Sequence, residues 1–352
     1  MAVTDRPLDR RPPVEAAAGP LAEAVDVHKV FLRRHGLMGG ATPIYAVSGV
    51  NLTVGVGEVL GLVGESGCGK STVGRLMLGL LRPTSGAVFF EGRNVNNLSP
   101  GQLKPLRRDM QIIFQDPLAS LNPFMSVEEI IVEPLRIHRA TPRHQWQVRV
   151  RQLLDLVGLP VSALRRKPTE FSGGQQQRIG IARALALEPR FIVADEALSA
   201  LDVSIQAQIL NLFMAIQKEL GISYLFISHN LVVVRHISHR IAVMYLGKVV
   251  ETAPAAELYL SPKHPYTLAL LSAVPLPSPE AERRRRRIPL AGDPPDPSRV
   301  PGGCPFHPRC WMAIDRCAVE VPELRQVGSE GHYSACHLAE QTPPIDGASA
   351  TQ

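Results

Sequence analysis

Apolar residues along the chain fall into short runs, and the segments between these runs carry apolar residues at helical spacing. The runs FIVAD (191–195) and SYLFIS (223–228) are rich in Ile, Val and Phe, which is typical of buried parallel strands. A largely helical stretch is expected from about Ser126 to Leu159. Strands separated by helical segments predict a βαβ architecture, so we expect an α/β fold. Further strands are expected at 24–31, 45–54, 58–64, 86–92 and 111–115, and a helix from about 69 to 80.

Composition divides the chain into three parts. Residues 1–20 are rich in Pro, Ala, Arg and Asp without apolar periodicity, which predicts a mobile tail. After about Ser261 the alternating pattern gives way to irregular, Pro-rich segments. We therefore expect a tail at 1–20, a main domain at 21–261 and a smaller extension at 262–352.

Charge and hydropathy exclude several classes of protein. The 38 Lys and Arg exceed the 32 Asp and Glu by six, but five of these cations form one run, Arg283 to Arg287. We interpret that run as a solvated surface segment, with attraction to anionic lipid as the weaker alternative. Composition therefore gives no case for nucleic-acid binding. The longest stretch without charge, 36–57, is interrupted by Gly and Pro43, so no membrane span is predicted.

The segment GESGCGKS (64–71) follows an expected strand, precedes an expected helix and fits the pattern G-x-x-x-x-G-K-[ST]. Glycines let backbone N–H groups face a phosphate, and the helix N-terminus adds the positive end of its dipole. Lys70 is expected to reach the β- and γ-phosphates, Ser71 to ligate Mg²⁺ and Thr72 to donate to a phosphate oxygen. The competing interpretation is a Gly-rich turn with a surface lysine. The predicted nucleotide-binding residues here are Gly64, Glu65, Ser66, Gly67, Cys68, Gly69, Lys70, Ser71 and Thr72.

Two carboxylates follow the buried run FIVAD. Asp195 ends this run, at the sheet edge where open α/β folds bind ligands, and suits Mg²⁺ coordination through water. Glu196 comes next and is placed to orient and deprotonate a water that attacks the γ-phosphate. Such a pair at a strand end is common, and only the phosphate loop favours the functional interpretation.

A second anion-binding turn opens another expected helix. Ser172, Gly173, Gly174 and Gln175 precede the helical run IGIARALAL. One nucleotide does not need two such sites from one chain. We infer that this turn serves the nucleotide of a second subunit.

With this second turn, the sequence resembles the nucleotide-binding subunits of ABC transporters from about residue 24 to 340. Phe171 replaces the usual Leu of the signature Leu-Ser-Gly-Gly-Gln, and Ala197-Leu198 stand where the family has Pro-Thr. The resemblance makes Gln115 the Q-loop glutamine, Asp202 part of the D-loop and His229 the switch histidine. Phe31 is matched to the aromatic residue that stacks on adenine, with Tyr45 as the alternative.

The resemblance also implies a fold and a mechanism. The fold would be a RecA-like α/β core with an antiparallel β edge and a helical subdomain at about 116–175. Two subunits would enclose two ATP molecules head to tail. ATP and Mg²⁺ are the implied cofactors. The implied catalytic residues are Lys70, Gln115, Glu196 and His229, and the implied Mg²⁺ ligands are Ser71, Gln115 and Asp195.

Two stretches carry a finer resemblance. QDPLASLNP (115–123) is similar to the Q-loop of oligopeptide, dipeptide and nickel importers, and SPKHPYTLALLSAVPLP (261–277) followed by GCPFHPRC (303–310) resembles the region appended in that subfamily. This implies a peripheral ATPase on the cytoplasmic face of the membrane. The implied partners are two permease subunits, an identical or paralogous ATPase and an extracytoplasmic substrate-binding protein. Peptides are the expected cargo, and a nickel chelate is the alternative.

Four of the five cysteines lie in the extension: Cys304, Cys310, Cys317 and Cys336, spaced C-x5-C-x6-C-x18-C. Four thiolates suit tetrahedral zinc or an iron–sulfur cluster. The spacing resembles that of subfamily members that carry a [4Fe–4S] cluster, and His307 is an additional candidate ligand. The alternative is four unliganded thiols. Cys68 needs no metal.

Two other functions compete with an importer ATPase. A soluble ABC ATPase acting on nucleic acid predicts a coiled-coil insertion, a second cassette or zinc modules within the core, and the sequence contains none of these. A P-loop kinase of another family leaves the Ser-Gly-Gly-Gln helix unexplained.

Overall fold

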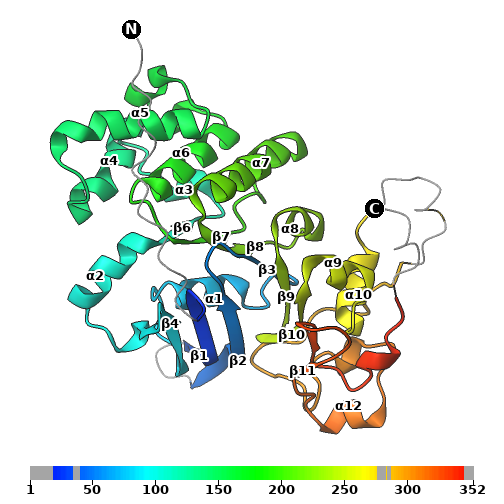
Figure 1. The fold of residues 1–352 in the computed structure, drawn as a ribbon. Helices are drawn as coiled ribbons and strands as arrows, with labels where there is room; N and C mark the ends of the chain where they lie inside the picture. Colours follow the sequence, from blue (N-terminus) through cyan, green and yellow to red (C-terminus); the bar gives the residue numbers. More distant parts are fainter. Residues whose placement is uncertain (1–18, 35–39, 276–282, 284–286, 345–352) are drawn as a thin grey trace. The chain divides into compact units, whose positions relative to one another are not determined.

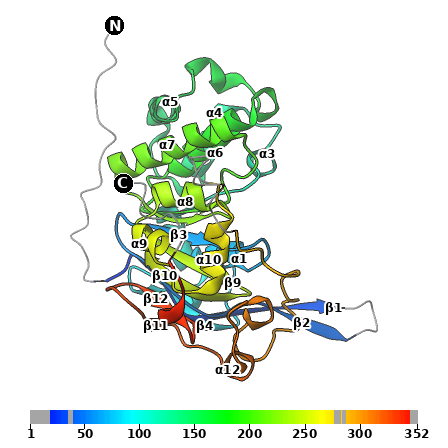
Figure 2. The same ribbon diagram turned by 90° about the vertical axis from the view of Figure 1, so that its right-hand side faces the viewer.

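The computed structural model describes residues 19–34, 40–275, 283 and 287–344. These residues form two compact units. The first comprises the described residues of 1–23, 53–58 and 89–225, and the second those of 24–52, 59–88 and 226–352. Both units are drawn in Figures 1 and 2. Most of the expected tail and positions 284–286 of the arginine run lie outside the described residues.

Two sheets frame the second unit. In the smaller sheet β1 lies between β2 and β4, and five strands of the larger sheet follow the order β11-β12-β10-β9-β3. Strand β3 runs parallel to β9, whereas β9, β10, β12 and β11 pair antiparallel. The strands are β1 (Ala22–Arg34), β2 (Ala41–Val54), β3 (Val59–Val63), β4 (Ser85–Phe90), β9 (Arg240–Tyr245), β10 (Lys248–Pro254), β11 (Arg325–Gln326) and β12 (Tyr333–Ser334).

Local sequence explains where two helices of the second unit begin. Helix α1 follows the phosphate loop at Gly69, and α8 begins after Asn230, whose side chain accepts from the N–H groups of Val232 and Val233. The helices are α1 (Lys70–Met77), α8 (Leu231–Ile237), α9 (Ala255–Leu260), α10 (Pro265–Ser272), α12 (Asp315–Val319) and the 3-10 turns η5 (His307–Arg309) and η6 (Ala339–Gln341).

The first unit combines strands with most of the helices. Strand β6 (Met110–Ile113) runs parallel to β7 (Phe191–Asp195), and β8 (Ser223–Ile227) is the other neighbour of β7. The remaining elements are β5 (Arg93–Asn94), η1 (Val95–Asn97), α2 (Pro100–Asp109), α3 (Pro117–Ser120), α4 (Val127–His138), η2 (Arg143–Gln145), α5 (Trp146–Leu156), η3 (Val161–Arg165), η4 (Pro168–Glu170), α6 (Gly173–Leu185) and α7 (Val203–Leu220). The helical stretch expected from Ser126 to Leu159 is confirmed as α4, η2 and α5.

Local capping explains where these helices start. Ser126 precedes α4, its N–H donates to Oε2 of Glu129 at 2.7 Å, and its hydroxyl accepts from the Glu129 N–H. Such a reciprocal pair satisfies two N–H groups that a helix start leaves unbonded. Ser172 and Gln175 form a similar box at the start of α6.

The C-terminal extension adds two strands to the larger sheet of the second unit. Thr252 of β10 pairs with Tyr333 of β12, and β12 pairs with β11. Beneath this edge Glu251 is buried and accepts hydrogen bonds from the N–H groups of Lys263 and His264 and from Nε2 of His332. A buried carboxylate requires such partners, so residues from β10, the 261–264 turn and the extension are fixed together.

Apolar side chains fill the interior of each unit. Strands β3, β7 and β8 are buried throughout, as expected for the apolar runs from which they were predicted. Among the described residues, no helix combines the length and apolar character needed to span a membrane.

Candidate nucleotide-binding site

The phosphate loop lies in the second unit, between β3 and α1, as the sequence predicts. Gly64 and Gly69 have φ of 154° and 107°, and a Cβ on either would lie 2.1 Å from a backbone oxygen, that of Met244 or of Ala46. Only glycine fits this close approach. Helix α1 has no side-chain cap at its start, so its first N–H groups suit an anion. The loop therefore fits the phosphates of a nucleotide.

Lys70 is buried and points back across this loop. Its Nζ donates to the carbonyl oxygens of Gly64 and Glu65, both at 2.9 Å, and lies 3.9 Å from Sγ of Cys68. Burial raises the pKa of the Cys68 thiol, which Lys70 partly offsets. The ammonium group is therefore fixed where phosphate oxygens would meet it, and Ser71 and Thr72 follow it in the first turn of α1.

Three further predicted residues lie in the second unit. His229 is exposed between β8 and α8. Phe31 and Tyr45 are each 39% exposed, and Nζ of Lys29 lies 5.1 Å from the centre of the Phe31 ring. Neither aromatic is a core residue, and stacking on adenine stays a prediction for both.

The first unit brings two predicted catalytic residues together. Nε2 of Gln115 donates to Oε2 of Glu196 at 2.9 Å, and the buried Asp195 ends β7 directly before Glu196. Glu196 has a φ of 48°, uncommon for a residue with a side chain. The N–H and hydroxyl of Ser199 both donate to its carbonyl oxygen and hold this turn. Such local strain is typical of functional positions.

The signature turn presents an accessible helix start. Ser172, Gly173 and Gln175 are exposed at the start of α6, whereas Gly174 is buried. A Cβ on Gly174 would lie 2.5 Å from Cγ2 of Ile205, so this glycine allows α6 to pack against α7.

Two residues beside the signature turn have structural roles here. Phe171, which replaces the usual Leu, is buried beneath the guanidinium of Arg166 at 4.2 Å. The carboxylate of Asp202 caps α7: it accepts from the N–H of Ile205 and the hydroxyl of Ser204, and these bonds lower its pKa. Contact of Asp202 with nucleotide stays a prediction.

A contact that the sequence does not reveal fixes the phosphate loop. The carboxylate of Glu65 forms two hydrogen bonds with Arg309, NH1 to Oε2 at 2.7 Å and NH2 to Oε1 at 3.1 Å. The Glu65 N–H donates to the Tyr266 hydroxyl at 2.9 Å. The hydrogen bond to Glu65 raises the pKa of Arg309 above its ordinary value. The extension thus contacts the phosphate loop directly.

The four cysteines of the extension line one small hollow in the second unit. Burial, with the charges of neighbouring thiolates, raises the pKa of Cys310 to about 11 and that of Cys336 to about 12. Within the described residues, no group of three or more His, Cys, Asp or Glu is arranged so that it could hold a metal ion. The other residues lining the hollow are His264, Pro265, Phe306, His307, Met312, His337 and Leu338.

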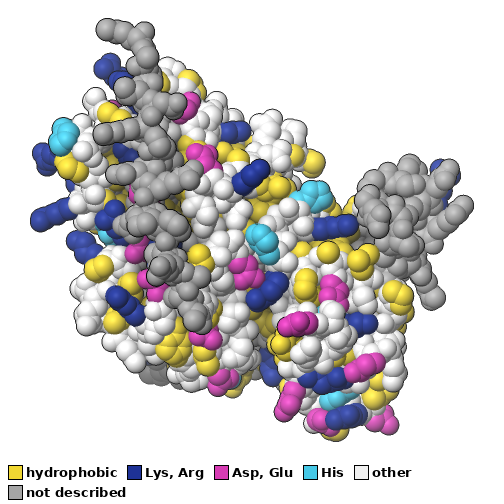
Figure 3. All heavy atoms as spheres, viewed as in Figure 1, with side chains coloured by type: hydrophobic (Ala, Val, Ile, Leu, Met, Phe, Trp, Pro, Cys, Tyr) yellow, Lys and Arg dark blue, Asp and Glu magenta, His cyan; other side chains and the backbone are white. Residues whose placement is uncertain are grey.

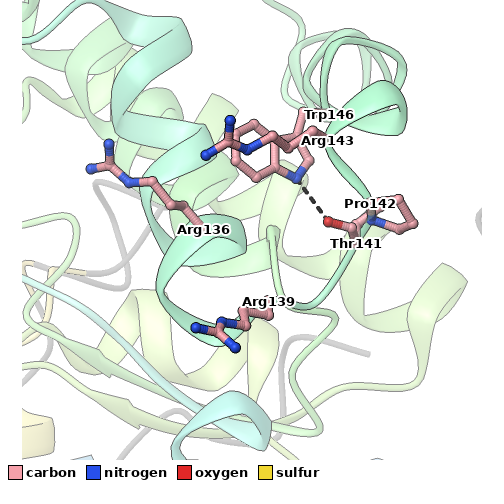
Figure 4. Close-up of a pocket in the computed structure, with 6 residues that line it drawn as sticks. All are labelled: Arg136, Arg139, Thr141, Pro142, Arg143 and Trp146. Carbon is pink, nitrogen blue, oxygen red and sulfur yellow. Dashed lines mark hydrogen bonds between the residues drawn. The ribbon is translucent and has the colours of Figure 1, made fainter.

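A basic hollow of about 590 Å³ lies at the end of α4 in the first unit. Figure 3 shows basic side chains along the edge where α2 and α4 lie, and Figure 4 shows the hollow. The guanidinium of Arg143 lies 5.7 Å from the ring of Trp146, whose Nε1 donates to the Thr141 carbonyl at 2.9 Å. Arg136, Arg139 and Pro142 complete the lining, which includes none of the predicted nucleotide-binding residues.

The comparison with known proteins supports the assignment of this region as a nucleotide-binding site. A family model described as ABC transporter matches residues 47–199, and one described as Oligopeptide/dipeptide transporter, C-terminal region, matches residues 250–317. A probable peptide ABC transporter ATP-binding protein of Sinorhizobium fredii is 52% identical over 84% of this chain and 83% of its own length. An oligopeptide transport ATP-binding protein of Bacillus subtilis is 49% identical over 90% of this chain and 97% of its own.

Solved structures share the fold. The dimeric ATP-binding cassette MJ0796, bound to ADP and phosphate, is 31% identical and superposes with a TM-score of 0.59 over 66% of this chain and 98% of its own. The protein cbiO1 from Clostridium perfringens, part of the ABC transporter complex cbiONQ, is 26% identical and has the same TM-score over 68% of this chain and 91% of its own. The chain hydrolyses ATP as an ABC ATPase, and it belongs to the ATP-binding proteins of the oligopeptide/dipeptide family of ABC transporters.

Proposed function

We propose that this chain drives the uptake of peptides through a pair of membrane-embedded permease subunits. The observation that carries this proposal is the oligopeptide/dipeptide C-terminal region at residues 250–317, attached to a cassette with a complete set of nucleotide motifs. The Q-loop stretch 115–123 supports it, because in ABC subunits this loop receives the permease. The chain would act at the cytoplasmic face of the membrane as a peripheral subunit, fed by an extracytoplasmic substrate-binding protein.

Each catalytic site would be shared by two ATPase subunits, identical or paralogous. Lys70 and its loop would bind the phosphates from one side, and the exposed start of α6 at Ser172 would bind them from the partner. A helix start suits this role because its free N–H groups and dipole attract anions. The solved structures of the MJ0796 cassette are dimeric, which supports pairing of two ATPase subunits by similarity.

Within one site the residues have separate tasks. Lys70 would stabilise negative charge on the transferred phosphoryl group, and His229 would contact the γ-phosphate. Glu196, held by Gln115, would accept the proton of the attacking water. Mg²⁺ would neutralise phosphate charge, and the hydroxyl of Ser71, the amide of Gln115 and the carboxylate of Asp195 have the oxygen donors that this ion prefers.

The four thiols of the extension would hold a [4Fe–4S] cluster with a structural or regulatory role. They line one hollow, and burial there raises the pKa of Cys310 and Cys336, so thiolates at these positions would need positive charge nearby. A bound metal centre supplies such charge. The sequence spacing of these cysteines, which resembles that of subfamily members with such a cluster, favours [4Fe–4S] over zinc, and His307 lines the same hollow.

Transport into proteoliposomes tests the proposed function. Complexes captured from membranes through this chain should contain two permease subunits, and ATP should drive uptake of labelled di- and oligopeptides. A complex that takes up a nickel chelate but no peptide would shift the cargo to nickel. Capture without any permease, together with ATPase stimulated by nucleic acid, would refute the proposal.

A further inference from the structure

Every polar group of Glu65 is occupied. Its carboxylate binds Arg309, its N–H donates to the Tyr266 hydroxyl, and its carbonyl oxygen accepts from Nζ of Lys70 at 2.9 Å and from the N–H of Cys68 at 3.3 Å. The two contacts outside the loop both come from residues C-terminal to position 261. Residues of the extension therefore help to orient the peptide group of Glu65. Because the carbonyl oxygen of Glu65 accepts from Lys70, they also help to position the Lys70 ammonium group.

Arg309 is itself held tightly. Its side chain is only 6% exposed, its Nε donates to the Ala291 carbonyl at 3.1 Å, and its NH1 lies 3.4 Å from the Tyr245 hydroxyl. A guanidinium that meets a carboxylate through two parallel bonds has a defined direction as well as a charge. Lysine offers the charge without that direction.

Aromatic rings pack the turn that carries Arg309 against Tyr245 and Tyr266. The ring of Phe306 lies 5.2 Å from that of Tyr245 and 5.3 Å from that of Tyr266, and the two tyrosine rings are 4.7 Å apart. Phe306 stands three residues before Arg309 in the same turn. Displacing the turn would therefore disturb Tyr266 and Arg309 together.

Cysteines close both ends of this turn. The N–H of His307 donates to the Cys304 carbonyl, the N–H of Cys310 to the His307 carbonyl, and the N–H of Cys304 to the Cys317 carbonyl. Arg309 pairs with Glu65 of the phosphate loop, and its neighbour in the sequence, Cys310, lines the hollow.

We propose that Arg309 is a positioning residue for nucleotide binding: the cysteine-containing turn of the extension sets Glu65, and through it Lys70, to receive the phosphates of ATP. The inference needs only the ATPase activity of this family. It does not depend on peptide transport or on a metal centre at the thiols.

The test compares Arg309→Gln with Arg316→Gln. Arg316 is a matched control, because it forms a two-bond pair with Glu320 in the same extension but on an exposed helix face. Losing the charge-assisted pair should weaken ATP binding about tenfold, which corresponds to about 1.4 kcal/mol. Arg316→Gln should bind like the wild type. The loss should appear mainly in KM, because the phosphate contacts form in the ground state as well as in the transition state.

Two further measurements separate positioning from general destabilisation. Amide exchange should accelerate at residues 64–70 in Arg309→Gln while the strands β9 and β10 keep their protection. Arg309→Lys, which keeps a charge in place if the glutamine variant folds poorly, should give an intermediate ATP affinity. Because removing both partners leaves no unpaired charge, Glu65→Gln combined with Arg309→Gln should cost less than the sum of the single changes. ATP affinity and exchange at 64–70 that match Arg316→Gln in both Arg309 variants would overturn the inference.

Discussion

Gln115 and Glu196 are 81 positions apart, yet the side-chain amide of the first donates to the carboxylate of the second at 2.9 Å. The bond joins a residue two positions after β6 to the residue directly after β7, and these two strands are parallel neighbours. We therefore expect a movement of the 115–123 loop to reorient Glu196, the proposed general base. This gives a direct physical route from the proposed permease-facing loop to hydrolysis.

Replacing Glu196 by Gln should stop turnover while leaving ATP binding intact. The substitution keeps the shape of the side chain and removes the proton acceptor, so hydrolysis should fall by roughly two orders of magnitude or more. Steady-state phosphate release and equilibrium ATP binding measure the two effects. Hydrolysis near the wild-type rate in the assembled complex would contradict the assignment.

A dimer that combines two defective chains should keep one of its two ATP sites intact if Ser172 binds the nucleotide of the partner subunit. In a dimer of Lys70→Ala with Ser172→Arg, both defects fall in one shared site and the other stays intact. If Ser172 served its own chain, each site would carry one defect and activity would be lost. ATPase of the mixed dimer, compared with both single-variant homodimers, decides between these arrangements where the chain pairs with itself.

Protein purified without oxygen should be brown and contain about four irons per chain if the extension holds a [4Fe–4S] cluster. Cys310→Ser should remove the colour and make residues 290–340 more sensitive to protease. Cys68→Ser is the matched control, since that thiol is buried in the phosphate loop and does not line the hollow. A content of one zinc per chain would indicate a zinc site in place of the cluster. The absence of any stoichiometric metal would refute both sites.

Stability should depend on pH through His332. Burial favours its neutral form, but the hydrogen bonds and charges of Glu251 and Glu257 outweigh this and raise its pKa above the ordinary value. The folded state therefore binds a proton more tightly than the unfolded state does. The resulting stabilisation is complete below about pH 6.5, the unfolded pKa, and is lost as the pH rises through the folded pKa.

Urea unfolding of wild type and His332→Gln between pH 6 and 9 measures this effect. The difference in unfolding free energy between the two proteins should be largest at pH 6 and shrink as the pH rises. A difference that stays constant or grows with pH would mean that His332 is neutral in the folded protein.

The elements that can be predicted from the sequence are those whose cause is local. The loop 64–71 needs glycines at fixed positions and a helix directly after it, and consecutive residues of the sequence meet both requirements. The strand 191–195 and the helix start at Ser172 were predicted for the same reason, and the structure confirms both. Whether Lys70 and Glu196 meet in one site stays a prediction from motif order.

The contacts of the extension could not be predicted, because their partners are remote. Arg309 and Glu65 are 244 positions apart, and nothing in a Pro-rich segment distinguishes a buried arginine from an exposed one. The extension has a very small apolar cluster of its own, around Val327, Cys336 and Ala339. Phe306 instead packs on tyrosines of β9 and α10, which no local pattern indicates.

The pairing of β12 with β10 has a consequence for how this chain avoids self-association. An unpaired strand edge is a template for another chain, and short or charged outer strands suppress this. Here the sheet of the second unit ends in β11, a two-residue exposed strand that contains Arg325. A protein shortened after residue 261 would lose β11 and β12 and leave Glu251 and Thr252 of the seven-residue strand β10 without their paired strand. We therefore expect a protein without the extension to self-associate more readily than the full chain.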